Sequence, residues 1–158
     1  MASVVRFRRK FDRSLPAMLK LKDDFGAEEH EYMAASAVSM EEVINISARA
    51  INFCIRNGYP GETAFRVGLC IEEMAGNVLE HGFRGDRSCY ADVRIVSKGG
   101  ELTVRARNNC REFDPRKRID IVNPAYPEKN IGIRLTSKMA KRIDYYNNAG
   151  INTLIMKL

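Results

Sequence analysis

The sequence has no tryptophan, only two histidines and four cysteines, and none of its apolar runs approaches the about 20 residues that a transmembrane helix needs. The cysteines form no CxxC pair, so a zinc site is not expected. No apolar run follows the basic N-terminal residues, which argues against a secretory signal and makes the cytoplasm the expected compartment. The four cysteines, Cys54, Cys70, Cys89 and Cys110, could in principle make two disulfides, but in that compartment we expect most of them to be reduced and to pack as small apolar side chains.

What the sequence does contain is the composition of one compact domain. Of its 158 residues, 45% are hydrophobic and 29% are charged, which suits a single globular core. The net charge of +6 would suit a nucleotide phosphate, an acidic protein partner, an anionic membrane or a nucleic acid. The two basic stretches, residues 6–13 and 111–118, are not patterned as an aromatic stacking platform, so we do not expect direct contact with nucleic acid.

Residues 1–27 differ from the rest of the chain, and we interpret them as a basic N-terminal arm or linker before a domain at residues 28–158. The arm starts with five basic residues and then has the pattern of a short helix from Leu15 to Phe25. A solvated tail is one interpretation of this charge. A juxtamembrane segment is the other, so a membrane is an expected partner only if the chain is a piece of a longer protein.

Helical periodicity predicts two consecutive helices after a first strand at residues 29–38. Ser39 and Glu42 form a Ser-x-x-Glu capping box, and the helix that it starts should end near Asn57. Its apolar stripe is expected to consist of Val43, Ile44, Ser47, Ala50, Ile51, Cys54 and Ile55. The second helix should run from Pro60 to about His81.

The C-terminal half of the chain has the alternation of strands. Residues 89–98 and 101–108 predict a hairpin around Gly99 and Gly100, in which Val93 and Ile95 pair with Leu102 and Val104. Residues 108–129 contain three prolines and little periodicity, and a loop of this length predicts a lid over a site. A helix at residues 131–141 and strands at residues 143–146 and 152–158 should complete the domain.

Three polar residues of the second predicted helix carry the main functional signal. Glu73, Asn77 and His81 are four residues apart, which stacks them along one side of a helix. A carboxylate can accept a proton, and an amide oxygen is a ligand suited to Mg²⁺. An exposed helix face is usually only solvated, and a histidine near a helix end is as often a cap, so the spacing alone does not decide the function.

The segment IEEMAGNVLEHGF resembles the N box of the GHKL ATPases, in the Glu-x-x-x-Asn-x-x-x-His form of the anti-sigma-factor serine kinases. The resemblance implies that Glu73 is the catalytic base, that Asn77 binds Mg²⁺ and that His81 contributes to the nucleotide site. Downstream, VRARNNCREFDP is similar to the family's Asp-x-Gly-x-Gly-Phe-Asp-Pro box, with Asn108 in the place of the aspartate that reads adenine. Phe113 keeps the pattern, whereas Cys110 and Glu112 replace both glycines.

Two further segments extend the likeness over residues 29–158. EKNIGIRL is similar to the Gly-x-Gly-Leu box at the start of a phosphate-facing helix, with Asn130, Gly132 and Ile133 at the matching positions. Thr153 stands where the closing strand has a threonine that binds adenine through water. The resemblance implies an α+β fold, a two-layer sandwich of the GHKL (Bergerat) type in which helices cover one face of a mixed, mostly antiparallel sheet.

The function that the resemblance implies is an ATP- and Mg²⁺-binding regulatory domain similar to serine/threonine protein kinases that act on anti-sigma pathways. Its partner would be a sigma factor or an antagonist-like regulator that is phosphorylated on serine, and a homodimer is implied by the likeness alone. The replaced glycines leave two alternatives open. One is a degenerate GHKL domain that serves as a protein-interaction scaffold with weak or no nucleotide binding. The other is the catalytic domain of a larger sensor kinase.

Overall fold

The computed structural model describes residues 29–81, 89–112, 114–117 and 131–158, and the predicted N-terminal arm lies outside these residues. After a short 3-10 turn, η2 (Glu29–Glu31), the chain forms strand β1 (Tyr32–Ala37) and helices α2 (Met40–Arg56) and α3 (Gly61–His81). The remaining regular elements are β2 (Ala91–Lys98), β3 (Glu101–Asn108), η3 (Pro115–Lys117), α4 (Ile131–Met139), β4 (Arg142–Asn148) and β5 (Ile151–Lys157). None of the helices in this described part is long and apolar enough to span a membrane.

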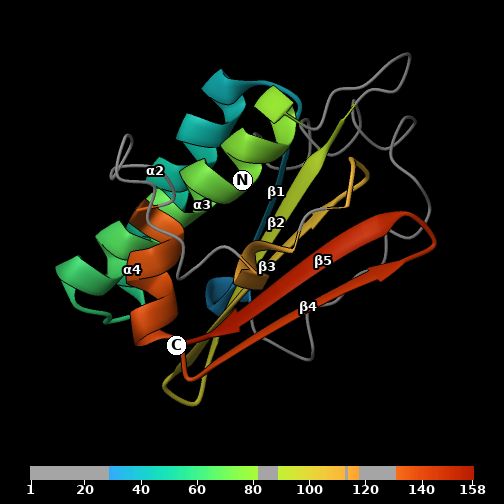
Figure 1. The fold of residues 1–158 in the computed structure, drawn as a ribbon. Helices are drawn as coiled ribbons and strands as arrows, with labels where there is room; N and C mark the ends of the chain where they lie inside the picture. Colours follow the sequence, from blue (N-terminus) through green and yellow to red (C-terminus); the bar gives the residue numbers. More distant parts are fainter. Residues whose placement is uncertain (1–28, 82–88, 113, 118–130) are drawn as a thin grey trace.

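The five strands form one sheet in the order β1-β2-β3-β5-β4, and the three α-helices cover one face of it (Figure 1). This arrangement confirms the expected α+β, two-layer fold. Every pairing among the described strands is antiparallel, so the expected mixed sheet contains no parallel pair in this part of the chain. Side chains that face the helices along the strands join those of α2 and α3 in one core, with Val43, Ile71, Ile95 and Val104 among the most deeply buried.

The sequence signals at the start of α2 act as expected. The Ser39 hydroxyl accepts a hydrogen bond from the Glu42 backbone N–H at 3.3 Å, and the Glu42 carboxylate accepts one from the Val38 N–H at 2.8 Å. Two N–H groups that the helix itself cannot pair are thereby satisfied. The capping box is confirmed, with the glutamate bonded one residue upstream of the cap.

The core face of α2 differs from the predicted stripe. Ile44 and Ile55 are 56% and 52% exposed, whereas Ile46 and Phe53 are buried and were not in that stripe. A helix turns about 100° per residue. Ile44 and Ile55 each follow a buried residue and are rotated toward solvent, while Ile46 and Phe53 are rotated in the opposite direction, into the core.

The β2–β3 hairpin forms at the predicted place with a corrected register. Its two-residue turn uses positive backbone φ angles of 59° at Gly99 and 77° at Gly100, which favour glycine. This turn sets Lys98 opposite Glu101, and every later pair follows from that start. Ile95 therefore pairs with Val104 as predicted, but Val93 pairs with Ala106 and Leu102 with Ser97, so those two predicted partners are wrong.

The face of the sheet that points away from the helices carries a buried polar group. Asp92 accepts hydrogen bonds from the Ser36 hydroxyl at 3.0 Å and from Arg94 Nε at 2.9 Å. The Asp92 and Arg94 side chains are 6% and 8% exposed, so this is a buried ion pair. Its carboxylate is compensated by both partners, as a charge removed from water requires.

Candidate functional site at one end of the sheet

Helix α3 carries Glu73, Asn77 and His81 in its second half, as the sequence predicts. Glu73 is half-buried. The side chains of Asn77 and His81 lie outside the described part, although their backbone belongs to α3. The four-residue spacing on a continuous helix places the three positions along one side of α3.

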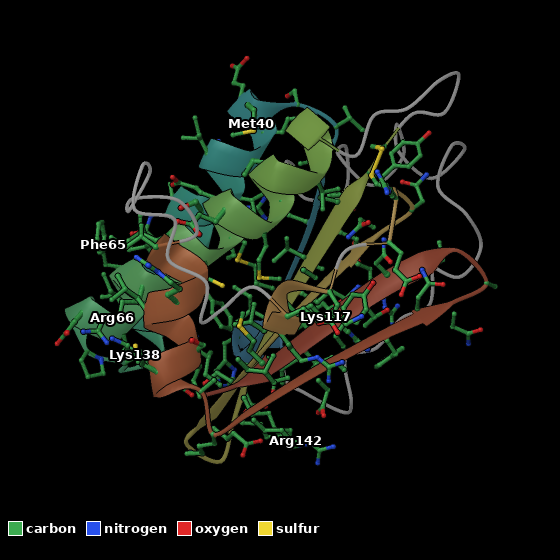
Figure 2. The ribbon with its side chains drawn as sticks, viewed as in Figure 1. Met40, Phe65, Arg66, Lys117, Lys138 and Arg142 are labelled. Carbon is green, nitrogen blue, oxygen red and sulfur yellow. A yellow bond between two sulfur atoms is a disulfide. The ribbon has the colours of Figure 1, made fainter. Side chains whose placement is uncertain are left out.

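Packing between α2 and α3 fixes where this half of α3 lies. A Cβ atom added at Gly76, next to Asn77, would lie 3.1 Å from Cε of Met40, the first residue of α2. Earlier in α3, a Cβ at Gly68 would lie 2.9 Å from Oγ of Ser47, within α2. The two helices are thus antiparallel, and Figure 2 shows Met40 and Arg66 toward opposite ends of the helical layer. The Asn77 end of α3 lies beside the start of α2.

One end of the sheet lies at the same place. Ala37, the last residue of β1, comes just before the α2 cap and pairs with Ala91. Ala91 pairs with Asn108, which pairs with Asn152, so these four residues form one row across four strands. We call this row the site end of the sheet. It brings Asn108, at the end of β3, to the end of the fold that carries Asn77.

Asn152 is the centre of the hydrogen bonding at the site end. Its amide nitrogen donates to Asn108 Oδ1 at 2.8 Å and to the backbone oxygens of Cys110 at 3.1 Å and Arg111 at 3.2 Å. Its amide oxygen accepts from the Tyr145 hydroxyl and from Asn147 Nδ2, both at 2.8 Å. The residue is 2% exposed. A single buried amide therefore joins β3, the segment that follows it, and the β4–β5 hairpin, and we call this group the asparagine network.

The turn after β3 shows how the chain manages without the two expected glycines. The only non-glycine residue with positive φ in the described part is Ala149, so neither Cys110 nor Glu112 needs the backbone freedom of glycine. The Cys110 N–H donates to Asn108 Oδ1 at 3.2 Å, and Asn109 Oδ1 accepts from the Tyr90 N–H at 2.8 Å. Side-chain amides thus hold this turn.

Two cysteines at the site end form a disulfide, between Cys89 before β2 and Cys110 after β3, with 5.4 Å between their Cα atoms. The expectation of reduced cysteines is therefore wrong for this pair, because the hairpin register brings both to the same end of neighbouring strands. Cys54 and Cys70 are buried thiols that form no disulfide in the described part of the chain, as expected. Burial raises the pKa of the Cys54 thiol to about 11, which keeps it protonated and unreactive at neutral pH.

The segment that begins with Asp114 is held against β4. The Asp114 carboxylate accepts hydrogen bonds from the Arg116 backbone N–H at 3.0 Å and from Arg116 Nε and Nη2 at 3.0 and 2.9 Å. These bonds, first of all those from the guanidinium, hold the pKa of Asp114 below its ordinary value. The same guanidinium lies 5.7 Å from the ring centre of Tyr145, within reach of a cation–π interaction. Tyr145 thus links this segment to the asparagine network.

Helix α4 packs against α3 and carries the Gly-x-Gly-Leu positions at its start. Gly132 and Ile133 lie in its first turn, but the surroundings of their side chains are outside the described part. Asn130 and Phe113 lie outside the described part altogether. Its last turn leads to Lys141, whose N–H donates to the Lys157 oxygen at 2.8 Å, at the opposite end of the sheet from Asn152. Figure 2 shows Lys138 away from Met40, so the amino end of α4 points toward the site end.

The strand register separates Thr153 from Asn108. Asn152 points toward the helices, as its bond to Tyr145 and the burial of Leu154 in the core show. Successive strand residues alternate between faces, so Thr153 points to the other face, where it pairs with Arg107. The structure brings Asn152, rather than Thr153, together with Asn108. The sequence analysis missed Asn152, for which the only signal was an asparagine at an inward position of a strand.

The model of the histidine kinase-like ATPase domain family matches residues 36–158, most of the chain. A solved histidine kinase domain from the Erythrobacter litoralis EL346 blue-light activated histidine kinase aligns with a TM-score of 0.48 and 20% identity, over 75% of this chain and 59% of that one. A structure of the Erythrobacter litoralis EL346 blue-light activated histidine kinase aligns with a TM-score of 0.47 and 22% identity, over 73% and 40%. The chain thus spans about half the length of these structures. No curated protein matches it significantly in sequence. By its family match, the chain belongs to the histidine kinase-like ATPase domain family.

Proposed function

We propose that the chain is a regulatory domain that binds a purine nucleoside triphosphate with Mg²⁺ and transfers the γ-phosphate to a serine hydroxyl of a protein partner. The observation that carries the proposal is the meeting of the Asn77 end of α3 with Asn108 at the site end of the sheet. Packing of Gly76 on Met40 and the strand register produce this meeting. In this proposal Asn108 reads the base, Asn77 would hold Mg²⁺ and Glu73 would act at the γ-phosphate.

The residues at this end suit such a ligand. Helix α4 has no acidic residue in its first turn, so no carboxylate there repels an anion at the amino end of the helix, where unpaired N–H groups favour one. Asn77 offers an amide oxygen to Mg²⁺, a cation that usually takes few protein ligands together with phosphate oxygens. When bound, Mg²⁺ neutralises part of the phosphate charge.

Glu73 acts in this proposal as the general base. Its carboxylate accepts the proton of the serine hydroxyl while the hydroxyl oxygen forms a bond to the γ-phosphorus. The bond between that phosphorus and the bridging oxygen breaks, and a nucleoside diphosphate leaves. Because Glu73 is half-buried, its charge is more weakly screened than that of a fully exposed carboxylate.

Calorimetric titration with ATP, GTP and ITP, with and without Mg²⁺, tests the binding step. We expect saturable binding of at least one of these nucleotides, weakened by removal of Mg²⁺ and by Asn77→Ala. A chain that binds none of the three at millimolar concentration would instead be the degenerate scaffold. The replaced glycines at Cys110 and Glu112 are the observation that favours that alternative.

The chemical step has a separate test in Glu73→Gln, which keeps the size of the side chain but cannot accept the proton. We expect this variant to bind nucleotide as the native chain does and to lose Mg²⁺-dependent transfer of the γ-phosphate to a serine of the partner protein. Glu72→Gln, the neighbouring half-buried carboxylate on the same helix, is the matched control and should keep that activity. Equal activity in Glu73→Gln and the native chain would refute the role of Glu73.

The identity of the partner protein is inferred from the subfamily likeness alone, because no contact of the described residues identifies it. We propose a sigma factor or an antagonist-like regulator as that partner. The chain could instead serve as the catalytic domain of a larger sensor kinase, in which case the phosphoacceptor would be a histidine. Acid stability of the phosphorylated product separates the two, because phosphoserine survives acid and phosphohistidine does not.

A further inference from the structure

The amide oxygen of Asn108 is already used by the protein. It accepts one hydrogen bond from the Cys110 backbone N–H at 3.2 Å and a second from Asn152 Nδ2 at 2.8 Å. An amide oxygen has two lone pairs, so these donors occupy its accepting capacity. Among the residues that the structure describes, Asn108 Nδ2 has no acceptor. The remaining polar group of the half-buried Asn108 side chain is therefore a donor, its amide nitrogen Nδ2.

Backbone groups fix this orientation of the amide. A backbone N–H can only donate, so the atom of Asn108 that faces Cys110 N must be the oxygen. The Asn152 amide is fixed in the same way, because its nitrogen faces the carbonyl oxygens of Cys110 and Arg111, which can only accept. Exchanging oxygen and nitrogen in either side chain would set donor against donor or acceptor against acceptor.

A donor at this position suits a different purine from the one that an aspartate reads. The 6-amino group of adenine is a donor and pairs with a carboxylate, whereas guanine carries an acceptor, O6, at the same position. We propose that Asn108 determines base specificity and that the site prefers a 6-oxopurine nucleotide, guanine or hypoxanthine, over adenine. This inference rests on the proposed nucleotide binding and names the class of nucleotide.

The preference has a predicted size. With adenine, the amino group and Asn108 Nδ2 would face each other as two donors, and each would lose a partner that water supplies in the free state. One such unmade hydrogen bond corresponds to about tenfold in affinity or more. With a 6-oxopurine the same nitrogen donates to O6, and the asparagine network stays as it is.

Titration of the full chain with Mg²⁺ and ATP, GTP or ITP measures this preference. We expect GTP and ITP to bind at least about tenfold more tightly than ATP. Similar affinities for GTP and ITP would locate the recognition at O6, because hypoxanthine lacks the 2-amino group of guanine. ATP binding that equals or exceeds that of both would overturn the inference while leaving the proposed function intact. Binding of none of the three would overturn both.

Asn108→Asp provides the complementary test. The carboxylate can still accept from Cys110 N and Asn152 Nδ2, and it adds accepting capacity for the adenine amino group. We expect the preference to turn toward ATP. Asn109→Asp is the matched control, since it adds the same charge one residue away, where Oδ1 accepts from the Tyr90 N–H. If both variants changed the ratio of ATP to GTP affinity equally, the effect would be one of charge, and Asn108 would not read the base.

Discussion

The helical layer and the asparagine network hold the molecule together by different means. Between α2 and α3 the contacts are apolar and close, and Gly68 leaves room for the Ile51 and Ser47 side chains of the facing helix. At the site end, the turn after β3 is held by hydrogen bonds to Asn152 and by the Cys89–Cys110 disulfide. Apolar packing is spread over many side chains, whereas the shape of this turn depends on a few groups. The site end is therefore the part where one substitution can change the local structure without changing the fold.

The largest expected effect comes from the disulfide. Cys89 and Cys110 are 21 positions apart, and closing a loop of this size stabilises the folded state by about 3 kcal/mol in the chain-entropy model. We expect Cys89→Ser to lower the free energy of unfolding by about this amount, measured by urea denaturation without reductant. A dithiol reductant should lower the free energy of unfolding of the native chain to that of the variant.

The other cysteines make this experiment specific. Cys54 and Cys70 are buried and form no disulfide in the described part, so the reductant has one described bond to break. Cys89→Ser itself should not respond to reductant. If the native chain has the same urea midpoint with and without reductant, the disulfide does not stabilise the fold and the asparagine network alone holds the turn. In a reducing compartment the pair would be two thiols, and the free energy of unfolding measured with reductant would be the relevant one.

The sequence was informative where one residue type has one structural meaning. Ser39 and Glu42 located the start of α2, and Gly99 with Gly100 located the hairpin turn, because capping and positive φ restrict the residue types. Asn152 could not be found in this way, since an asparagine in a strand has no characteristic spacing and its role depends on partners from three other segments. The pairing of Cys89 with Cys110 likewise depends on the register of the hairpin, which local pattern does not give.

A second prediction tests the close packing in the helical layer. A Cβ atom at Gly68 would lie 2.7 Å from Ile51 Cδ1 and 2.9 Å from Ser47 Oγ, so both side chains would have to move. Overpacking of this kind costs about 1–3 kcal/mol, while alanine in a helix gains about 1 kcal/mol over glycine. We expect Gly68→Ala to destabilise the fold by about 1 kcal/mol net in urea denaturation.

Gly61→Ala is the matched control for Gly68→Ala. Nothing lies within 4 Å of a Cβ atom at Gly61, the first residue of α3, so only the gain in helix propensity remains. The two substitutions should therefore change stability in opposite directions. A stabilising Gly68→Ala would show that α2 and α3 can separate freely, and the contrast between a closely packed helical layer and a polar site end would not hold.

The smallest expected effect is a pH dependence at the site end. Hydrogen bonds from Arg116 hold the pKa of Asp114 below its ordinary value, so the folded state binds this proton less readily than the unfolded chain. The stabilisation is fully present above the ordinary aspartate pKa of about 3.9 and is lost as the pH falls through the lowered folded pKa.

Thermal unfolding should show Asp114→Asn less stable than the native chain at pH 6, with the difference shrinking below pH 4. Since Arg116 is 44% exposed, solvent screens the pair and the effect should be small. In an Arg116→Gln background the same substitution should produce a smaller, flatter difference, because the guanidinium, the largest cause of the lowered pKa of Asp114, is gone. A difference that persists unchanged at low pH in the native background would instead assign the role of Asp114 to the hydrogen bonds of its side chain rather than to its charge.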